Sequence, residues 1–452
     1  MDKVMDRCGL FGLYDQDTFD TARVIYYGLF SLQHRGVEAA GICVNHDGKF
    51  LYKKDKGLVT DVFDEDSLKK LPGRIGIGHV LRYAGNDAVE NAQPIVIRYT
   101  NGHMAVAMNG GLTNLEELRH ELELTGAVFQ TMEAAEVVSV LISRARTQYP
   151  TIEEAIAHVM PMLKGGYAML VMTRHKLIGV RDSHGLRPLM LGKKKNSWFL
   201  SSETCAFNEL DVDYVKDIDP GEIAVINQRG VNFLDVGADQ GSALCIFEYI
   251  YHSRPDSEIS GLEVYKARAA MGRELAKAAL TNADAVIWVP DSGLATATGY
   301  SEMSGIPLVD AFVKNRYFGT KLLKPDAEMF GRGINMKLSV IRSRVAGKRV
   351  VVVDDSMIAG TTAKIFVSAL KEAGAKEVHL RISAPPVRFV CPYGAASPDA
   401  SALEAGGRSV DEICRDIGAD SLAFLPQEAM LRACAEAGCG FCCACFDGNY
   451  PA

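Results

Sequence analysis

The chain has 452 residues, of which 48% are hydrophobic and 23% are charged, and its formal net charge is −7. These values exclude a disordered or collagen-like chain, and at about 150 residues per domain the length predicts two or three domains. The sequence has no basic cluster of the kind that binds nucleic acid and no apolar run of about 18 residues that would cross a membrane. Its start, Met1 to Arg7, is polar where a signal peptide turns apolar, so we expect a cytoplasmic protein with neither nucleic acid nor membrane as a partner.

The first half of the chain, up to about residue 235, is predicted to be an α+β unit with packed sheets. Short apolar runs broken by Gly, Asn and Asp are typical of strands, whereas longer runs with a period near 3.6 indicate helices. The clearest predicted strands are 105–108, 168–172 and 223–226. Helices are predicted over 21–32, 115–124 and 133–145.

The second half changes its pattern near residue 263 and alternates helices with short, continuously apolar strands. Helices are predicted over 264–280 and 361–373, and strands over 285–290, 349–353 and 378–382. Uninterrupted β-branched runs between helices indicate a parallel sheet covered on both faces, as in α/β proteins. The boundary between the halves is predicted between residues 235 and 260.

The string 350–362, Val-Val-Val-Val-Asp-Asp-Ser-Met-Ile-Ala-Gly-Thr-Thr, is the most specific motif in the chain. We expect its four Val to form a buried strand that ends at Asp354 and Asp355, at the edge of the sheet where such folds bind ligands. The following helix begins with Thr361 and Thr362, whose N–H groups and hydroxyls suit a phosphate, while the two carboxylates suit a sugar diol or a hard cation. Two acids alone would more often precede a simply capped helix, but the full string favours a phosphorylated ligand.

Two further segments of the second half carry groups that suit a pyrophosphate. The turn 289–293 offers the hydroxyl of Ser292 beside a Gly, although a plain strand-ending turn fits equally well. The segment 314–319 combines Lys314, an Arg and Tyr317 before a Gly, which suits a mobile lid over a leaving pyrophosphate. Taken alone, this segment also fits a solvated basic turn.

Cys8 lies in the small-residue run Arg-Cys-Gly-Leu-Phe-Gly near the start of the chain. A lone early cysteine is most often a small buried apolar residue. Four further segments change this interpretation, because with Cys8 they resemble the class II glutamine amidotransferases of the N-terminal-nucleophile type. These segments are Leu-Gln-His-Arg-Gly-Val-Glu-Ala-Ala-Gly-Ile (32–42), Gly-His-Val-Leu-Arg-Tyr (78–83), Asn-Gly-Gly-Leu-Thr-Asn (109–114) and Arg-Asp-Ser-His-Gly-Leu-Arg-Pro (181–188).

The string 350–362 resembles the phosphoribosyl pyrophosphate (PRPP) loop of the type I phosphoribosyltransferases. With the segments 247–257 and 417–422, the motifs run in one order from Cys8 to Pro451, and the chain resembles the amidophosphoribosyltransferase family. Members of that family make 5-phosphoribosylamine, glutamate and pyrophosphate from PRPP, glutamine and water, in the first step of de novo purine synthesis. The resemblance implies purine nucleotides as inhibitors and a homo-oligomer, either a dimer or a tetramer.

The resemblance also implies a domain organisation. A glutamine amidotransferase domain of the N-terminal-nucleophile (Ntn) hydrolase fold, with stacked antiparallel sheets, would cover 8–235. A type I phosphoribosyltransferase domain of α/β type with a parallel sheet, followed by an iron–sulfur tail, would cover 236–452. Residues 1–7 would be a propeptide, whose removal frees the α-amine of Cys8. That amine has a lower pKa than a Lys amine, which suits it to activate the thiol as a base.

The family's roles can be carried over to positions of this chain. In the first domain Cys8 would attack glutamine, the amide of Asn109 and the N–H of Gly110 would stabilise the oxyanion, and Arg82 would pair with the glutamine carboxylate. The expected PRPP-binding residues are Asp354, Asp355, Ser356, Gly360, Thr361, Thr362, Lys314 and Tyr317. The expected magnesium ligands are Ser292, Asp354 and Asp355.

Several positions depart from the family's pattern. Ala134 stands where an Asp usually binds the α-ammonium of glutamine, and the neighbouring Glu133 is turned by about 100° from it if both lie on a helix. Met108 replaces a usual His, and Ala359 and Thr320 each replace a usual Arg. Arg82 lies one position later along the chain than in the family's pattern. One alternative function is therefore a relative with an impaired glutaminase half that uses ammonia or another acceptor. A second is a non-catalytic regulator that binds PRPP or nucleotides.

The chain has eleven cysteines, and six of them lie between residues 414 and 445. In a reducing compartment such crowding favours a metal site over disulfides. Two overlapping Cys-x-x-Cys pairs let two thiolates bind one metal or cluster. In the iron–sulfur branch of the family the ligand segments match those of this chain, which implies a [4Fe–4S] cluster on Cys245, Cys391, Cys442 and Cys445. Structural zinc and spare thiols are the alternatives.

Overall fold

The computed structural model describes residues 8–82, 89–237, 241–314, 338–393, 403 and 405–451. The predicted propeptide, Tyr317 and Thr320 lie outside these residues. Within the described ranges no helix combines the length and the apolar character that crossing a membrane requires.

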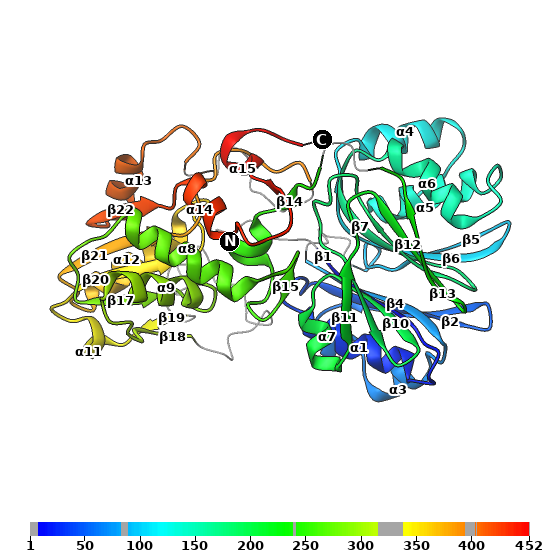
Figure 1. Ribbon diagram of the computed structural model, residues 1–452, viewed down its shortest axis with the longest axis horizontal. Coiled ribbons are helices and arrows are strands. Elements are labelled where there is room, and N and C mark those ends of the chain that lie inside the picture. The colour runs from blue at the N-terminus through cyan, green and yellow to red at the C-terminus, as the bar shows by residue number, and fades with distance from the viewer. Residues whose placement is uncertain are drawn as a thin grey trace.

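Two antiparallel sheets form the centre of the first half (Figure 1). The first sheet contains, in spatial order, β11 (Asp213–Asp217), β9 (Met190–Lys194), β10 (Ser197–Ser201), β1 (Cys8–Tyr14), β4 (Ile75–Leu81), β2 (Ala39–His46) and β3 (Lys49–Lys56). The second contains β13 (Gly230–Asp235), β12 (Glu222–Asn227), β8 (Leu177–Arg181), β7 (Gly165–Met172), β6 (Gly102–Leu112) and β5 (Ile95–Tyr99). Apolar side chains such as Leu10, Ile77, Ala107 and Leu170 pack in one core cluster contributed by both sheets.

Helices cover the outer faces of both sheets, which gives four layers in all (Figure 1). The first sheet is covered by α1 (Thr21–Ser31), α2 (Val59–Val62), α3 (Glu65–Lys69) and α7 (Cys205–Leu210). The second is covered by α4 (Leu115–Leu124), α5 (Ala134–Ala145), α6 (Ile152–Val159) and the short 3-10 turn Met160–Met162. This confirms the predicted α+β fold with stacked antiparallel sheets.

The second half contains a parallel sheet of four strands flanked by helices (Figure 1). Its strands are, in spatial order, β17 (Ala285–Trp288), β20 (Arg349–Asp354), β21 (Glu377–Ile382) and β22 (Ser421–Phe424). Its helices are α8 (Val264–Ala278), α9 (Leu294–Ser304), α11 (Arg342–Val345), α12 (Thr361–Glu372), α13 (Val410–Ile417) and α14 (Gln427–Ala433). The four Val of 350–353 are fully buried, as the continuous apolar run predicts, and the α/β fold is confirmed.

Short elements complete the second half. They are β14 (Leu244–Cys245), the π-helix Glu248–His252, β15 (Glu258–Ile259), β16 (Leu262–Glu263), β18 (Phe312–Lys314), β19 (Leu338–Val340), β23 (Phe441–Cys442) and α15 (Ala444–Asp447). The pairing of β23 with β14 is parallel and places Cys442 beside Cys245. The C-terminal tail thus returns to the boundary between the two halves, where it is drawn in red in Figure 1.

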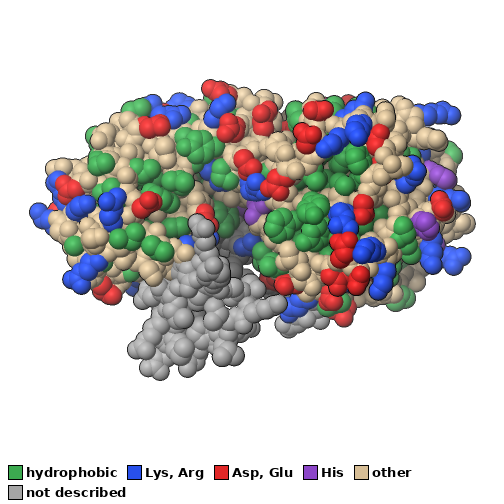
Figure 2. Space-filling model, turned by 90° about the horizontal axis from the view of Figure 1, so that it is seen from below, with side chains coloured by type: hydrophobic (Ala, Val, Ile, Leu, Met, Phe, Trp, Pro, Cys, Tyr) green, Lys and Arg blue, Asp and Glu red, His purple; other side chains and the backbone are tan. Residues whose placement is uncertain are grey.

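The surface of both halves carries mixed charges. Seen from below, acidic and basic side chains are interspersed with hydrophobic ones (Figure 2). Several large apolar side chains are exposed, among them Tyr27 and Phe30 of α1, which are 48% and 50% exposed. Tyr27 and Phe30 are three positions apart on α1, so their side chains lie on one face of that helix.

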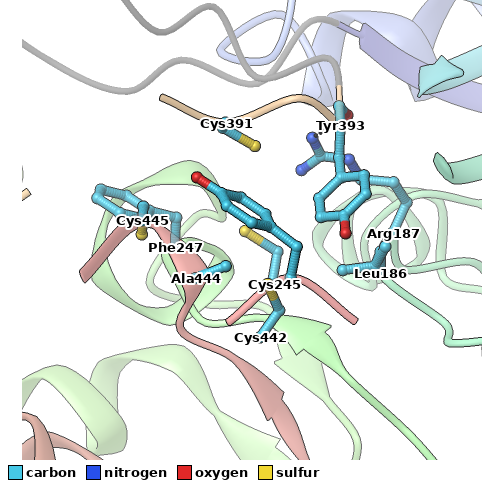
Figure 3. Close-up of a pocket in the computed structure, with 10 residues that line it drawn as sticks. Leu186, Arg187, Cys245, Phe247, Cys391, Tyr393, Cys442, Ala444 and Cys445 are labelled. Atoms are coloured by element: carbon cyan, nitrogen blue, oxygen red, sulfur yellow. Dashed lines mark hydrogen bonds between the residues drawn. The ribbon is translucent and has the colours of Figure 1, made fainter. Parts of the chain in front are cut away.

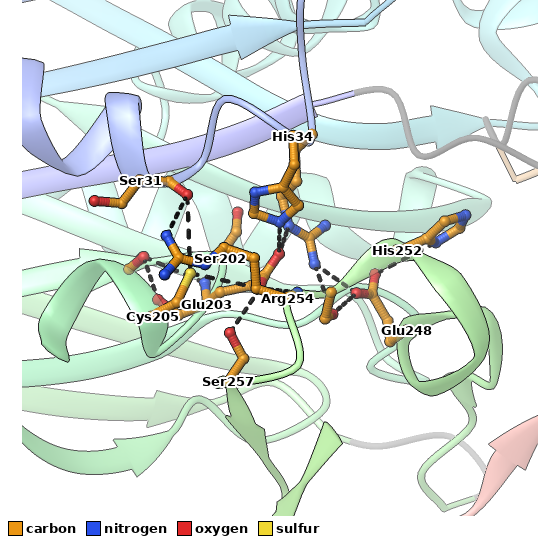
Figure 4. Close-up of polar contacts among 12 residues, drawn as sticks. Ser31, His34, Ser202, Glu203, Cys205, Glu248, His252, Arg254 and Ser257 are labelled. Atoms are coloured by element: carbon orange, nitrogen blue, oxygen red, sulfur yellow. Dashed lines mark hydrogen bonds and ion pairs between the residues drawn. The ribbon is translucent and has the colours of Figure 1, made fainter. Parts of the chain in front are cut away.

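A buried charge network joins the two halves (Figure 4). The guanidinium of Arg35, from the first half, forms ion pairs with Glu203 and with Glu248 of the second half. The Arg35 Nη2 atom also donates to Ser253 Oγ at 3.1 Å, and His34 Nε2 lies 2.6 Å from Glu203 Oε1. The side chains of Arg35, Glu203 and Glu248 are 0% exposed. Water therefore does not stabilise these charges, and each depends on its oppositely charged partner.

The network keeps its carboxylates ionised. Burial raises the pKa of Glu203, but Arg35 and His34 outweigh burial and hold that pKa well below its usual range. Burial likewise raises the pKa of Glu248, and Arg35 with His252 lowers it further than burial raises it. A carboxyl whose pKa is lower in the folded than in the unfolded state stabilises the fold above its unfolded pKa, and this stabilisation is lost as the pH falls through the folded pKa.

We expect Glu203→Gln to lower the free energy of unfolding by about 3–5 kcal/mol at pH 7, because it leaves the Arg35 charge less compensated inside the protein. The variant should also lose less stability than the wild type between pH 5 and pH 2, because it lacks the carboxyl that titrates there. Urea unfolding at several pH values measures both effects. Glu65→Gln, which removes an exposed partner of Arg23, is the control and should change neither. Equal stability of both variants would contradict the prediction.

Candidate active site

Cys8 begins β1, in the middle of the first sheet, and is 3% exposed. It pairs with Leu81 of β4, and with Ala39 and Ala92 these residues form a small apolar cluster. Side chains alternate along a strand, so Cys8 points to the same side as Leu10, which packs between the two sheets. The thiol therefore lies at one end of the space between the sheets.

Asn109 faces the same space from the second sheet. In β6 it lies two positions after Ala107, which packs between the sheets, so both side chains point to the same face. Asn109 is 0% exposed. Neither Oδ1 nor Nδ2 of Asn109 has a hydrogen-bond partner among the described residues, which costs about 1–3 kcal/mol in a buried site. The next residue, Gly110, has a φ of +111°, and a Cβ there would lie 2.0 Å from the carbonyl oxygen of Gly166, so only Gly fits. An unpaired amide beside a backbone of this shape suits the binding of a substrate oxygen.

Hydrogen bonds hold the strand segment before Asn109. Gln93 Oε1 accepts from the backbone N–H of Met108 at 2.7 Å, and Gln93 Nε2 donates to Glu133 Oε2 at 3.1 Å. His79 Nε2 lies 3.1 Å from the Met108 carbonyl oxygen, so we assign the ring proton to Nε2. Burial lowers the pKa of His79 to about 3, and the ring is therefore neutral near pH 7. Met108 is fixed from both sides, which positions Asn109.

The expected glutamine-binding residues lie close to this segment in the fold. Arg82 directly follows β4, and its Nη1 donates to the carbonyl of His34 at 3.2 Å. Ala134 is buried at the start of α5, whereas Glu133 is half-buried and directs its carboxylate to Gln93. The structure therefore connects Glu133, and not residue 134, to the polar contacts behind Asn109.

The second candidate site lies at the carboxyl edge of the parallel sheet. Trp288 of β17 pairs with Val353 of β20, and the N–H of Val289 donates to the Val353 carbonyl at 3.0 Å. The loop after β17, which contains Ser292, therefore begins beside the loop that follows Asp354. This adjacency brings a hydroxyl and two carboxylates to one edge, as the sequence predicts.

The acidic pair is buried and held by its own loop. Asp354 and Asp355 are 5% and 0% exposed. The N–H of Asp355 donates to Asp354 Oδ1 at 2.9 Å, and Ser356 Oγ donates to Asp355 Oδ1 at 2.7 Å. The hydroxyl of Ser383, which follows β21, donates to the Asp355 carbonyl at 3.2 Å. The loop is therefore fixed before any substrate binds.

The phosphate-binding part of the loop precedes α12. Gly360 is the N-cap residue with a φ of +65°, and Thr361 and Thr362 form the first turn of a 12-residue helix, whose N–H groups suit a phosphate. Lys314, at the end of β18, forms an ion pair with Asp291 in the loop after β17, so its ammonium lies at the same edge of the sheet.

Four cysteines predicted as ligands line one cavity (Figure 3). They are Cys245, Cys391, Cys442 and Cys445. Burial raises the pKa of Cys442 to about 11 and those of Cys245 and Cys445 well above their usual range. Among the residues that the structure describes, no three His, Cys, Asp or Glu side chains are grouped closely enough to hold a single metal ion. The other two cysteines between residues 439 and 445 are Cys439 and Cys443, and they do not line this cavity.

Sequence reasoning missed several residues that shape these sites. Gln93 carries no motif signal, and its role depends on a fold that brings residues 93, 108 and 133 together. Arg187 belongs to the segment 181–188, which carries the family resemblance, but nothing in the sequence indicates that it lines the cysteine cavity. The pairing of Arg35 with Glu248 joins residues 213 positions apart, which no local pattern predicts.

Comparisons with known proteins agree with both halves. Residues 80–209 match a glutamine amidotransferase domain, and residues 261–385 match a phosphoribosyl transferase domain. The chain is 42% identical to the amidophosphoribosyltransferase of Bacillus subtilis (strain 168), over 99% of this chain and 94% of that protein. It is also 42% identical to the amidophosphoribosyltransferase of Methanocaldococcus jannaschii, over 98% of this chain and 97% of that protein.

A solved structure of high similarity is the B. subtilis glutamine PRPP amidotransferase in complex with ADP and GMP. Its TM-score with this chain is 0.93 at 42% identity, and the match covers 98% of this chain and 97% of that chain. This agreement extends over both sheets of the first half and the parallel sheet of the second. On these grounds the chain belongs to the amidophosphoribosyltransferase family.

Proposed function

We propose that this chain converts PRPP, glutamine and water into 5-phosphoribosylamine, glutamate and pyrophosphate, at the start of de novo purine synthesis. The observation that supports the proposal is that one chain carries both groups of residues, one in each half. A buried cysteine faces an unpaired amide in the first half, and two buried carboxylates precede a phosphate-binding helix in the second. We place the glutaminase domain at 8–235 and the phosphoribosyltransferase domain at 236–452, with 1–7 as a propeptide.

In the glutaminase half, we assign Cys8 as the nucleophile. Its α-amine, freed by removal of the propeptide, takes the thiol proton, and the thiolate attacks the carboxamide carbon of glutamine. The oxyanion accepts hydrogen bonds from Asn109 Nδ2 and the N–H of Gly110, and the carbon–nitrogen bond then breaks as the nitrogen takes up a proton and leaves as ammonia. Water hydrolyses the thioester to glutamate. Arg82 holds the substrate carboxylate.

In the phosphoribosyltransferase half, ammonia that arrives through the protein attacks the anomeric carbon of PRPP, and the bond to pyrophosphate breaks. Asp354 and Asp355 hold the ribose diol, and the residues from Ser356 to Thr362 hold the 5-phosphate. Lys314 and Tyr317 are proposed to contact the pyrophosphate. The hard oxygen donors of Ser292, Asp354 and Asp355 suit a magnesium ion, which when bound neutralises charge on the pyrophosphate.

The four cysteines of the cavity are proposed to hold a [4Fe–4S] cluster. Thiolates are the ligands that such clusters use, and Cys245, Cys391, Cys442 and Cys445 come from three separate segments that converge on one cavity. The cluster's role would be structural, because binding would tie the C-terminal tail to the boundary between the domains. Four iron and four sulfide per chain in anaerobically purified protein would support this proposal, and zinc in their place would contradict it.

The experiment that tests the function is pyrophosphate release from PRPP and magnesium, measured once with glutamine and once with ammonium chloride. Release with both nitrogen sources would support the full reaction. Release with ammonia alone would favour the relative with an impaired glutaminase, a reading motivated by Ala134 and Met108. No release with either source would contradict the proposed function and favour a nucleotide-binding protein, as Ala359 also suggests.

Glu133 is proposed to bind the α-ammonium of glutamine. We expect Glu133→Gln to raise the KM for glutamine by about 10- to 100-fold, because a hydrogen bond to a charged group contributes about 1.5–3 kcal/mol. Activity with ammonia should not change, since that reaction bypasses the site. Glu123→Gln, on the exposed face of α4, is the matched control. A KM equal to that of the control would show that another group binds the ammonium.

We also propose that purine nucleotides inhibit the enzyme and that it forms a homo-oligomer, a dimer or a tetramer, in the cytoplasm. The related B. subtilis structure was solved with ADP and GMP, which supports nucleotide binding. The exposed side chains of Tyr27 and Phe30 on α1 support a contact between copies. Light scattering of the purified protein, with and without GMP, measures both the mass and its response to nucleotide.

A further inference from the structure

Arg187 connects the amidotransferase domain to two of the cysteine segments. It lies between β8 and β9 in the first domain and is 1% exposed. Its Nη2 donates to the carbonyl of Tyr393 at 3.0 Å, two residues after Cys391. The adjacent carbonyl, that of Leu186, accepts from the N–H of Cys245 at 3.1 Å. Two consecutive residues of one domain thus contact two segments that carry proposed cluster ligands.

The guanidinium of Arg187 also lines the cavity that the thiols surround (Figure 3). Among the described residues that line this cavity, Arg187 is the only one with a positive charge, and the others are the four cysteines, aromatic residues, Leu186 and Ala444.

The charge of the proposed cofactor makes a cation at this position favourable. Four thiolates around a doubly positive [4Fe–4S] core leave a net charge of about −2 in a largely apolar cavity, and a buried anion needs a compensating charge. An Arg is suited to this position because its side chain cannot be deprotonated in a protein. The reduced cluster carries one more negative charge, so a nearby cation favours reduction.

We propose that Arg187 is a positioning residue that supplies the countercharge of the cluster and ties the amidotransferase domain to it. This inference rests on the proposed [4Fe–4S] cofactor. It assigns to one side chain both the stability of the cluster and the attachment of the first domain to the segment of Cys391.

The test compares Arg187→Gln with the wild type in anaerobic redox titrations with dithionite, followed by electron paramagnetic resonance. We expect a tenfold shift of the one-electron equilibrium toward the oxidised cluster, which corresponds to about 59 mV. We also expect the cluster absorbance to be lost faster in air. Arg388→Gln removes an exposed charge on the segment that bonds Cys445, and it is the matched control, expected to shift neither value.

A second variant covers the case in which Arg187→Gln does not fold. Arg187→Lys keeps the charge but lacks the planar fork, so we expect a shift in the same direction that is smaller than tenfold. Wild-type behaviour of the soluble Arg187 variants in both measurements would overturn the inference while leaving the cofactor in place. Wild-type protein without iron and sulfide would instead remove the cofactor proposal, so the two failures are distinguishable.

Discussion

Replacing Cys8 by Ala is expected to abolish pyrophosphate release with glutamine and to leave release with ammonia close to the wild-type rate. The variant lacks the sulfur that attacks glutamine, and loss of a nucleophile typically lowers kcat by a factor of about 10³ or more. The ammonia reaction depends on the second site, whose carboxylates lie in the other domain. Parallel assays with the two nitrogen sources measure this separation directly.

The matched control for this prediction is Cys43→Ala. Cys43 lies in β2 of the same sheet, is fully buried, and has a pKa raised by burial beyond the range of a reactive thiol. Its replacement removes a similar volume from the same sheet, so a loss caused by misfolding would affect both variants. Glutamine-dependent activity that survives in Cys8→Ala would contradict the assignment of the nucleophile.

The fold was predictable where the sequence pattern is local. The four Val before Asp354 predict a buried parallel strand, because such strands are covered on both faces, and the strand is there. The helix over 115–124 matches α4 at both ends, since apolar residues recur on one face of it. These features depend on neighbours within a few residues along the chain.

The sites were predictable only in part, because chemistry at a site depends on residues far apart in sequence. The motif around Asn109 predicts an oxyanion-binding residue, but nothing local shows that its amide is buried and unpaired. The bridge through Gln93 to Glu133 spans 40 positions, and it decides which carboxylate reaches the site in place of Ala134. Long-range contacts of this kind follow from strand order rather than from periodicity.

Replacing Asp355 by Asn is expected to lower pyrophosphate release with both glutamine and ammonia by a factor of about 10² to 10³, the range typical for removal of one transition-state contact. The carboxylate is fully buried at the end of β20, and Ser356 Oγ holds its orientation. An amide cannot supply the negative charge that the proposed magnesium site requires, and its NH₂ group would oppose the Ser356 hydroxyl proton.

Together, Asp355→Asn and Cys8→Ala distinguish the roles of the two domains, because they are expected to affect the ammonia reaction differently. A defect in the second site stops the reaction whichever nitrogen source is used, whereas a defect in the first spares ammonia. Asp416→Asn on α13 removes an exposed carboxylate that pairs with Lys364, and it should behave as the wild type. If Asp355→Asn retained full activity with ammonia, the ribose of PRPP would have to be bound by groups other than this acidic pair.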